Sequence, residues 1–350
     1  MSARELELVG ASVINNGDCM AAVWFALSAV AVGVVGIILA RSSDLLGESL
    51  RLERSVTGFL LLAAATSLPE LVISCQVARE GRVGMAVGSV LGSCLMNLLI
   101  LAAIDLSRRG SGSMLSYKAA AHALSGLGSI LMSALVVVSI LVPGMPSLGA
   151  ISLGSLLVLV AYASSFRLVF LDRKVSRAAD AVESDQVETS DKPPRGFRLR
   201  PLWLYLGSSA GIFLLSSPLS VSSDQLATQL SLSGTFFGAV FLALVTSLPE
   251  IVTTYEASRI EADDMAIGNV LGSNAFNLLI LLAIDCVTPE PLFSTLGNVH
   301  AIAAIGIVVT TSIAAMGMLY RAEKRWWVFE PDALAVIAVS LTFFYLIYIG

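Results

Sequence analysis

The chain has 350 residues, of which 56% are hydrophobic and only 13% are charged, and its formal net charge is −5. A soluble domain carries about 25% charged residues, so this composition excludes an ordinary soluble protein. Apolar runs of about 20 residues recur, whereas the short alternating strands of a membrane barrel are absent from the sequence. We therefore expect an all-α membrane protein in a lipid bilayer, and we expect no nucleic-acid partner.

Ten apolar segments follow one another, and each is long enough to cross a bilayer as a helix. They fall at about 21–41, 56–78, 84–106, 119–142, 147–171, 201–220, 233–257, 265–287, 297–319 and 332–349. The one long polar stretch, 172–200, contains charged residues, serines and a Pro-Pro pair, which is typical of a flexible linker. The sequence therefore predicts a five-span unit over 1–171, a cytoplasmic linker over 172–200 and a second five-span unit over 201–350.

The two units are copies of each other. The pentapeptide Thr-Ser-Leu-Pro-Glu occurs at Thr66–Glu70 and again, 180 residues later, at Thr246–Glu250. In the following span, 13 of the 18 positions of 88–105 are identical in 268–285. Pro, Glu, Asn, Asp and Gly match as well as Leu and Val, so shared hydrophobicity does not explain the similarity. We expect repeated motifs over about 56–106 and 233–287.

An odd number of spans per copy turns the second copy upside down. Inverted repeats whose broken helices face each other at the midplane are a recurring plan of secondary transporters. With the N-terminus outside, 18 of the 21 Lys and Arg residues fall on the cytoplasmic side, in agreement with the positive-inside rule. We therefore expect a multi-pass protein of the cell membrane with both termini outside, and the sequence carries no signal of its oligomeric state.

Each copy of the pentapeptide places a proline beside a carboxylate in an apolar span. Proline frees the carbonyl four residues earlier, here that of Ala65, and the distortion can also loosen the Ala63 carbonyl. A carboxylate in hydrocarbon costs at least ~2.5–3.5 kcal/mol. Because Thr66 and Glu70 share a helix face, each copy offers hydroxyl, carboxylate and carbonyl oxygens at one depth. Two such half-sites can form a cage for calcium, which takes about 6–8 oxygen ligands.

The next span of each copy adds further polar groups. Ser93 and Asn97 are four residues apart and share a helix face, as do Ser273 and Asn277, so we expect them to contribute to the same site. A spacing of small residues that lets another backbone approach closely occurs in both copies, at Gly88, Gly92, Gly268 and Gly272.

Asp105 and Asp285 close these two spans at opposite membrane faces. Each carboxylate could mark the mouth of an access path or cap an interface between segments. We favour the capping interpretation.

The sequence resembles a sodium/calcium exchanger of the cation/calcium antiporter superfamily. The segments that carry this resemblance are Thr66–Glu70 with Gly88–Asn97, and Thr246–Glu250 with Gly268–Asn277, and the ten spans and the central loop agree with it. The resemblance implies that the two glutamates hold calcium and that neighbouring hydroxyls, carbonyls and amides line sodium sites. The residues that it implies are Glu70, Glu250, Thr66, Thr246, Ser67, Ser247, Ser93, Ser273, Asn97, Asn277, Ala63 and Ala243. It implies no cofactor, because calcium and sodium are the transported partners.

Three features depart from the pattern of that family. Ser89 and Cys94 stand where the family often has Asn, which indicates unequal halves. Asn277 stands where potassium-dependent members carry Asp, which favours exchange without potassium. The central loop is too short to contain the regulatory calcium-binding domains of animal exchangers.

We expect a secondary antiporter, not an enzyme, that exchanges sodium for calcium by alternating access at a central carboxylate site. An empty cavity with two negative charges is costly in a low dielectric, so crossing should require a loaded site, and this requirement couples the two fluxes. A calcium/proton antiporter remains an alternative, with Glu70 and Glu250 taking up protons. A cation channel is less favoured, because a channel needs no such loading and usually builds its pore from several subunits.

Overall fold

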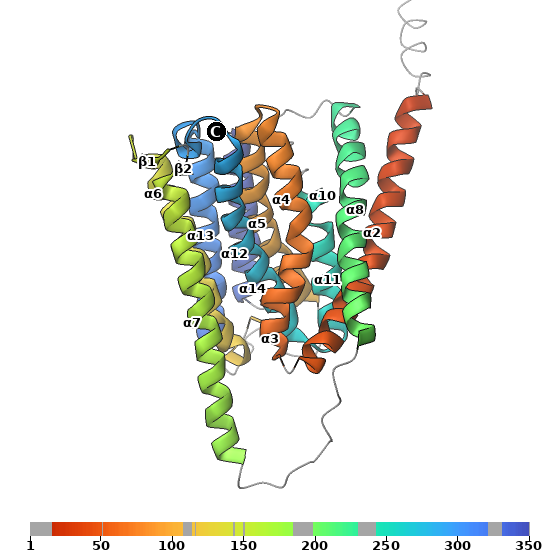
Figure 1. The fold of residues 1–350 in the computed structure, drawn as a ribbon, viewed down its shortest axis with the longest axis vertical. Coiled ribbons are helices and arrows are strands. Elements are labelled where there is room, and N and C mark those ends of the chain that lie inside the picture. The colour runs from red at the N-terminus through yellow and green to blue at the C-terminus, as the bar shows by residue number, and fades with distance from the viewer. Residues whose placement is uncertain are drawn as a thin grey trace, which may run out of the picture.

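A computed structural model describes residues 16–50, 52–107, 114–115, 117–142, 144–149, 151–184, 199–229, 243–320 and 331–349. Most of them are helical (Figure 1). The long helices are α2 (Asn16–Ser49), α4 (Ala63–Arg79), α5 (Val83–Ser107), α6 (Ala123–Leu141), α7 (Leu153–Ser184), α8 (Leu199–Gln229), α11 (Leu248–Arg259), α12 (Asp263–Val287), α13 (Asn298–Leu319) and α14 (Pro331–Ile349). The short elements are α3 (Arg54–Val56), η1 (Thr57–Leu62), η2 (Tyr117–His122), β1 (Ser147–Leu148), β2 (Ile151–Ser152), α10 (Ala243–Thr246) and η4 (Leu292–Ser294).

The expected class of an all-α membrane protein is confirmed. Among the described residues, nine helices are long and apolar enough to cross a membrane, and they coincide with nine of the ten predicted spans. The remaining predicted span, 233–257, is described only from Ala243 onward, as α10 and α11, and 233–242 lie outside the described residues. Large apolar side chains such as Trp24 on α2 and Trp203 on α8 are exposed on the outer helices, as expected for a surface that faces lipid.

The helices of the two copies are arranged as inverted mates. In Figure 1, α2 runs downward from the top of the molecule, whereas its mate α8 runs upward from the bottom. Helix α2 packs on α8 and α6 packs on α13, so each of these pairs joins a helix to its own mate. The contact between α11 and α2 corresponds to the contact between their mates, α4 and α8. In the same way, the contact between α14 and α13 corresponds to that between their mates, α7 and α6. The packing pattern is therefore preserved when the two copies are exchanged.

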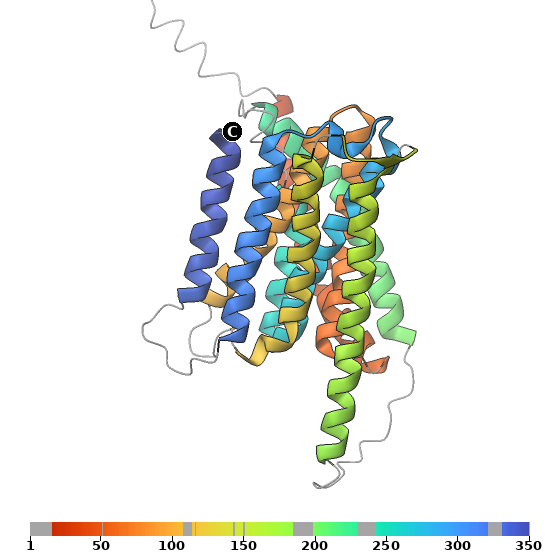
Figure 2. The ribbon, with the colours of Figure 1, turned by 90° about the vertical axis from the view of Figure 1, so that its left-hand side faces the viewer.

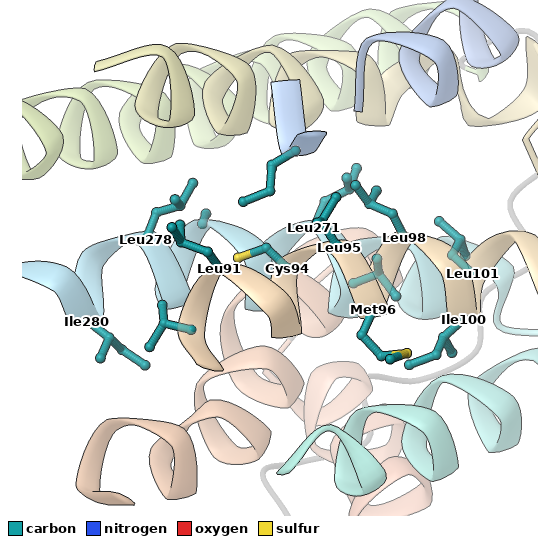
Figure 3. Packing of buried hydrophobic residues seen from close by; sticks show 14 of the residues in the cluster. Leu91, Cys94, Leu95, Met96, Leu98, Ile100, Leu101, Leu271, Leu278 and Ile280 are labelled. Atoms are coloured by element: carbon teal, nitrogen blue, oxygen red, sulfur yellow. The ribbon is translucent and has the colours of Figure 1, made fainter. Parts of the chain in front are cut away.

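Helices α2 and α8 are peripheral, whereas α5 and α12 lie at the centre of the bundle. In their most apolar stretches, 83% of α5 and 67% of α12 are buried, compared with 22% of α2 and of α8. Side chains from both central helices lie together in the core, among them Leu91 and Leu95 of α5 and Leu271 and Leu278 of α12 (Figure 3). The helices that carry Ser93, Asn97 and their mates therefore form the interior of the bundle.

Both motif helices are irregular, but in different ways. In the first copy, the π-helical segment η1 comes directly before α4, and α4 continues through Pro69. In the second copy, the helix is interrupted at Ser247, which has φ −83° and ψ 6° and separates α10 from α11. The first helix deviates before the motif rather than at Pro69, because a proline removes one backbone bond while the neighbouring bonds can continue. Short π segments in helices are frequent at functional sites.

Helix α7 is longer than predicted. It continues to Ser184 and projects beyond the neighbouring helices (Figures 1 and 2). Residues 172–184 are therefore helical rather than part of an irregular linker, because this segment contains alanine and charged residues of good helix propensity. Residues 185–198 lie outside the described residues. Before α7, β1 pairs antiparallel with β2, with Ser147 opposite Ser152, so the helix of this predicted span begins at Leu153 rather than at 147.

Candidate cation site

The two copies of the pentapeptide motif meet in the interior of the bundle. The Ser67 hydroxyl on α4 donates to Glu250 Oε1 on α11 over 3.4 Å. Glu70 and Glu250 lie close enough for their charges to act on each other. Helix α4 crosses the central helix α12, and α10 and α11 cross α5, so each motif is held against the central helix of the opposite copy. The fold thus brings together two carboxylates that are 180 residues apart in the sequence.

Two hydroxyl pairs repeat this crossing with the same geometry. Thr66 Oγ1 lies 3.4 Å from Ser273 Oγ, and Thr246 Oγ1 lies 3.4 Å from Ser93 Oγ. Each threonine hydroxyl also contacts a carbonyl three residues earlier in its own helix. Thr66 donates to the Ala63 oxygen and Thr246 to that of Ala243, both over 3.3 Å. The Ala243 carbonyl also accepts the Ser247 N–H over 3.0 Å, so the helical bond at this carbonyl is kept. Because a carbonyl oxygen has two lone pairs, a cation could bind it only in place of the threonine hydroxyl.

All twelve residues implied by the resemblance are buried, and none is more than 5% exposed. Several of their polar atoms have no hydrogen-bond partner within the described part of the chain. These atoms are both carboxylate oxygens of Glu70, Glu250 Oε2, Ser247 Oγ, Asn97 Oδ1, and both side-chain polar atoms of Asn277. A buried polar atom without a partner costs about 1–3 kcal/mol, and more when it is charged. Such a cluster in the centre of a bundle indicates a place for a ligand.

The chemistry of these atoms suits a hard cation. Neither Glu70 nor Glu250 forms an ion pair with a basic residue that the structure describes, so no fixed positive charge of the described helices neutralises them there. Most of the atoms without a partner are oxygens, from carboxylates, a hydroxyl and amides. Carboxylate, carbonyl and amide oxygens are the ligands that calcium takes in proteins. The donor set therefore fits calcium in both type and charge.

Glycines of α12 allow the first motif helix to reach this position. A Cβ on Gly268 would lie 2.5 Å from the Ser55 carbonyl oxygen, and one on Gly272 would lie 2.5 Å from that of Phe59. In turn, a Cβ on Gly58 would lie 2.2 Å from the Met265 carbonyl oxygen. The backbones of η1 and α12 are therefore in direct contact, and the predicted close packing is confirmed at Gly268 and Gly272. At Gly88 an added Cβ would meet no described atom within 4 Å, so close packing in the first copy stays a prediction.

Asp105 and Asp285 bind connecting segments at the two ends of the bundle. Asp105 accepts bonds from the backbone N–H groups of Met114 and Leu115, at 2.6 and 3.4 Å. Asp285 accepts bonds from the N–H groups of Ser152 and Leu292, both at 2.7 Å. The capping interpretation is confirmed for both residues.

One buried residue near the site was missed by the sequence interpretation. Asn274 is fully buried on α12, accepts a hydrogen bond from Asn97 and donates one to the Cys94 carbonyl oxygen. It occupies the position of Cys94 in the second copy. A mismatch of a thiol with an amide, inside an otherwise matching segment, was the signal that could have identified it.

A model of the protein family described as sodium/calcium exchanger protein matches residues 20–174 and 200–350. The chain belongs to the sodium/calcium exchanger family. Among its relatives, the putative antiporter CaxA of Alkalimonas amylolytica is 28% identical over 272 residues, which cover 74% of this chain and 79% of the relative. The Ca(2+)/H(+) antiporter ChaA of Bacillus subtilis is 22% identical over 306 residues, which cover 83% of each chain.

A solved structure of the exchanger NCX_Mj has the same fold as this exchanger-family chain. The two match with a TM-score of 0.66 over 93% of this chain and 97% of that chain, at 18% sequence identity. At this level of identity, the match establishes the fold and leaves the assignment of individual ions to the chemistry of the site.

Proposed function

We propose that this chain is a secondary antiporter that exchanges sodium for calcium through one central site. The observation that carries the proposal is the set of buried oxygens without partners that both copies contribute, including three of the four carboxylate oxygens of Glu70 and Glu250. One calcium ion would neutralise the two carboxylates, and several sodium ions would do the same. The twelve residues named above would contact these ions in alternation, so the chain acts as a transporter rather than as an enzyme.

Sodium is favoured over a proton by the number of neutral oxygens. A proton needs a single carboxylate oxygen, whereas sodium in transporters is coordinated by several oxygens, including those of unwound helix segments. The site supplies such groups in both copies, including the hydroxyls of Thr66 and Thr246 and the carbonyls of Ala63 and Ala243. The interruption at Ser247 lies in the same segment. This excess of neutral oxygens supports sodium as the second substrate.

Proton coupling is the second candidate. The name of the relative ChaA describes it as a calcium/proton antiporter, and its match covers 83% of this chain. Glu70 and Glu250 are both nearly fully buried, and protonation would remove their charges without a metal ion. The same two residues would then carry protons in one direction and calcium in the other.

The arrangement in the membrane is part of the proposal. The start of α2 and the end of α14 lie at one end of the bundle, and the end of α7 and the start of α8 lie at the other (Figure 1). We assign the first end to the outside of the cell membrane and the second to the cytoplasm, on the basis of the positive-inside rule. The two five-span units would meet at a cytoplasmic linker within 172–200.

Calcium uptake into proteoliposomes tests this function. Vesicles loaded with sodium should take up radioactive calcium, and vesicles loaded with choline should not, with a protonophore present in both cases. Omission of potassium should leave the rate unchanged. Uptake that does not depend on sodium, and that occurs only when the protonophore is left out, would establish proton coupling instead. Steady single-channel currents would establish a channel.

Variants of the carboxylates test the site itself. Glu70→Gln or Glu250→Gln should abolish calcium uptake while the protein still elutes as a folded species in detergent. Glu80→Gln is the matched control, because Glu80 is exposed and pairs with Arg82 outside the bundle interior. Uptake at the wild-type rate in either of the first two variants would show that the carboxylate is not a ligand.

A further inference from the structure

The two copies differ at one buried position beside the site, where Cys94 of α5 corresponds to Asn274 of α12. Both side chains are fully buried. Each of them lies three residues before a site asparagine in its own helix, Asn97 or Asn277, but the hydrogen bonds cross between the helices. Asn274 bonds to Asn97 of the opposite copy. When the two copies are exchanged, Asn97 becomes Asn277 and Asn274 becomes Cys94, so Cys94 is the residue in the equivalent position to support Asn277.

The hydrogen bonds of Asn274 determine which way the Asn97 amide faces. Asn274 Nδ2 donates to the Cys94 carbonyl oxygen over 3.1 Å. Because a carbonyl can only accept, the nitrogen of Asn274 must face Cys94, and its oxygen must face Asn97. Asn97 then has to present its own nitrogen, which donates to Asn274 Oδ1 over 3.0 Å. The Asn97 oxygen is left pointing away from this pair, buried and with no partner among the described residues.

Asn97 lies on the face of α5 that meets the motif of the second copy. It is four residues from Ser93 and so shares its face, and the Ser93 hydroxyl contacts Thr246 at 3.4 Å. The free oxygen of Asn97 is therefore available to the cation site with an orientation that the protein has already determined.

Asn277 has weaker support than Asn97, because a thiol is a weak hydrogen-bonding group. The residue in the equivalent position is Cys94, whose thiol donates to the backbone oxygen of Asn274 over 3.7 Å. Neither polar atom of the Asn277 side chain has a hydrogen bond of regular geometry in the described part of the structure, and the Cys94 thiol faces this amide only as a weak hydrogen-bond partner. Its amide can turn to offer oxygen to a cation or nitrogen to a carboxylate.

We infer that Asn274 is a positioning residue, which holds Asn97 as a fixed oxygen ligand, and that Cys94 leaves Asn277 able to turn. The inference deepens the proposed function and depends on it. Its consequence is that the two asparagines contribute unequally to calcium binding. A ligand that is already oriented loses less freedom when the ion binds, so the Asn97 oxygen should contribute more than the Asn277 oxygen.

Exchange of the two side chains tests the inference without changing the composition of the chain. In the wild type, Asn97→Ala should weaken calcium binding about five- to tenfold more than Asn277→Ala does, which is the effect of about one hydrogen bond. In the double variant Cys94→Asn/Asn274→Cys, the introduced amide should hold Asn277 instead of Asn97. The order should then reverse, with Asn277→Ala causing the larger loss. An unchanged order, or equal losses in both backgrounds, would overturn the inference.

A double-mutant cycle shows whether Asn274 acts through Asn97. Asn274→Cys alone should raise the KM for calcium about tenfold and leave kcat within about twofold. Once Asn97→Ala has removed the oxygen, Asn274→Cys should add less than about twofold, because coupled residues are not additive. If Asn274 served only in packing, Asn274→Cys would lower the thermal midpoint and the yield, and its effect on the KM for calcium would add to that of Asn97→Ala. That result would contradict the inference. If Asn274→Cys does not fold, the exchanged double variant alone decides the question.

Calcium binding to purified protein in detergent, measured by isothermal titration, separates this inference from the proposed function. Binding that is absent in the wild type would refute the proposed site. Binding that is present, lost in Glu70→Gln and unchanged in Asn274→Cys would refute only the role of Asn274.

Discussion

Replacement of Gly272 with alanine tests whether contact between α12 and η1 sets the geometry of the cation site. The added Cβ would lie 2.5 Å from the Phe59 carbonyl oxygen and 2.8 Å from the Ala63 Cβ. Ordinary contacts begin at 3.4 Å, so the first motif helix and α12 must separate by about 0.9 Å. The displaced segment includes Ala63, whose carbonyl is one of the proposed ligands.

Two magnitudes follow from this separation. Overpacking of this kind costs about 1–3 kcal/mol of folding free energy. A metal site tolerates changes of about 0.2 Å in its ligand distances, so a shift of about 0.9 Å exceeds this tolerance several times. The loss of one ligand should raise the KM for calcium about tenfold, which corresponds to about 1.4 kcal/mol.

The assay combines thermal unfolding in detergent with calcium uptake in proteoliposomes. Gly207→Ala is the matched control, because Gly207 is an exposed residue of α8 with no described atom within 4 Å of the added Cβ. The control should keep the wild-type KM and should be equally or more stable, since alanine has the higher helix propensity. A Gly272→Ala variant with wild-type KM and stability would refute the argument from close backbone contact.

Three further variants test other parts of the structure. Arg41→Gln removes one ion-pair partner of Glu256, which is buried and lies 2.7 Å from Arg41. The variant should lose about 1–3 kcal/mol of stability in thermal unfolding. The loss is limited to this size because Arg259 still pairs with the same carboxylate. An unchanged midpoint would show that the Arg41 pair is dispensable. Asp285→Asn replaces a carboxylate that accepts two N–H groups with an amide that also donates. The free energy of unfolding should fall by about 2–4 kcal/mol, without a change in the KM for calcium. A changed KM would favour the access-path interpretation instead. Asn277→Asp adds a third carboxylate to the site and should alter the cation dependence of uptake, up to and including a requirement for potassium. An ion profile identical to that of the parent would show that this position does not select cations.

The sequence by itself determined the class of the protein, the positions of the spans and the duplication. Apolar length and composition are local properties, so nine of the predicted spans coincide with helices. The repeated Thr-Ser-Leu-Pro-Glu identified both motif helices, because charged and helix-breaking groups are costly in lipid and are retained where they are used. The inverted arrangement followed from the odd number of spans in each copy.

Only the tertiary structure decided how the two copies meet. The bond from Ser67 to Glu250 and the contacts between η1 and α12 join residues far apart in the sequence, and no local pattern reports such contacts. The π-helical turn at Thr57–Leu62 could not be predicted either, because it depends on packing against α12 rather than on the nearby proline. The role of Asn274 became visible only when its amide was seen bonded to the opposite copy. Helix periodicity shows which residues share a face, but packing between helices decides which face each of them meets.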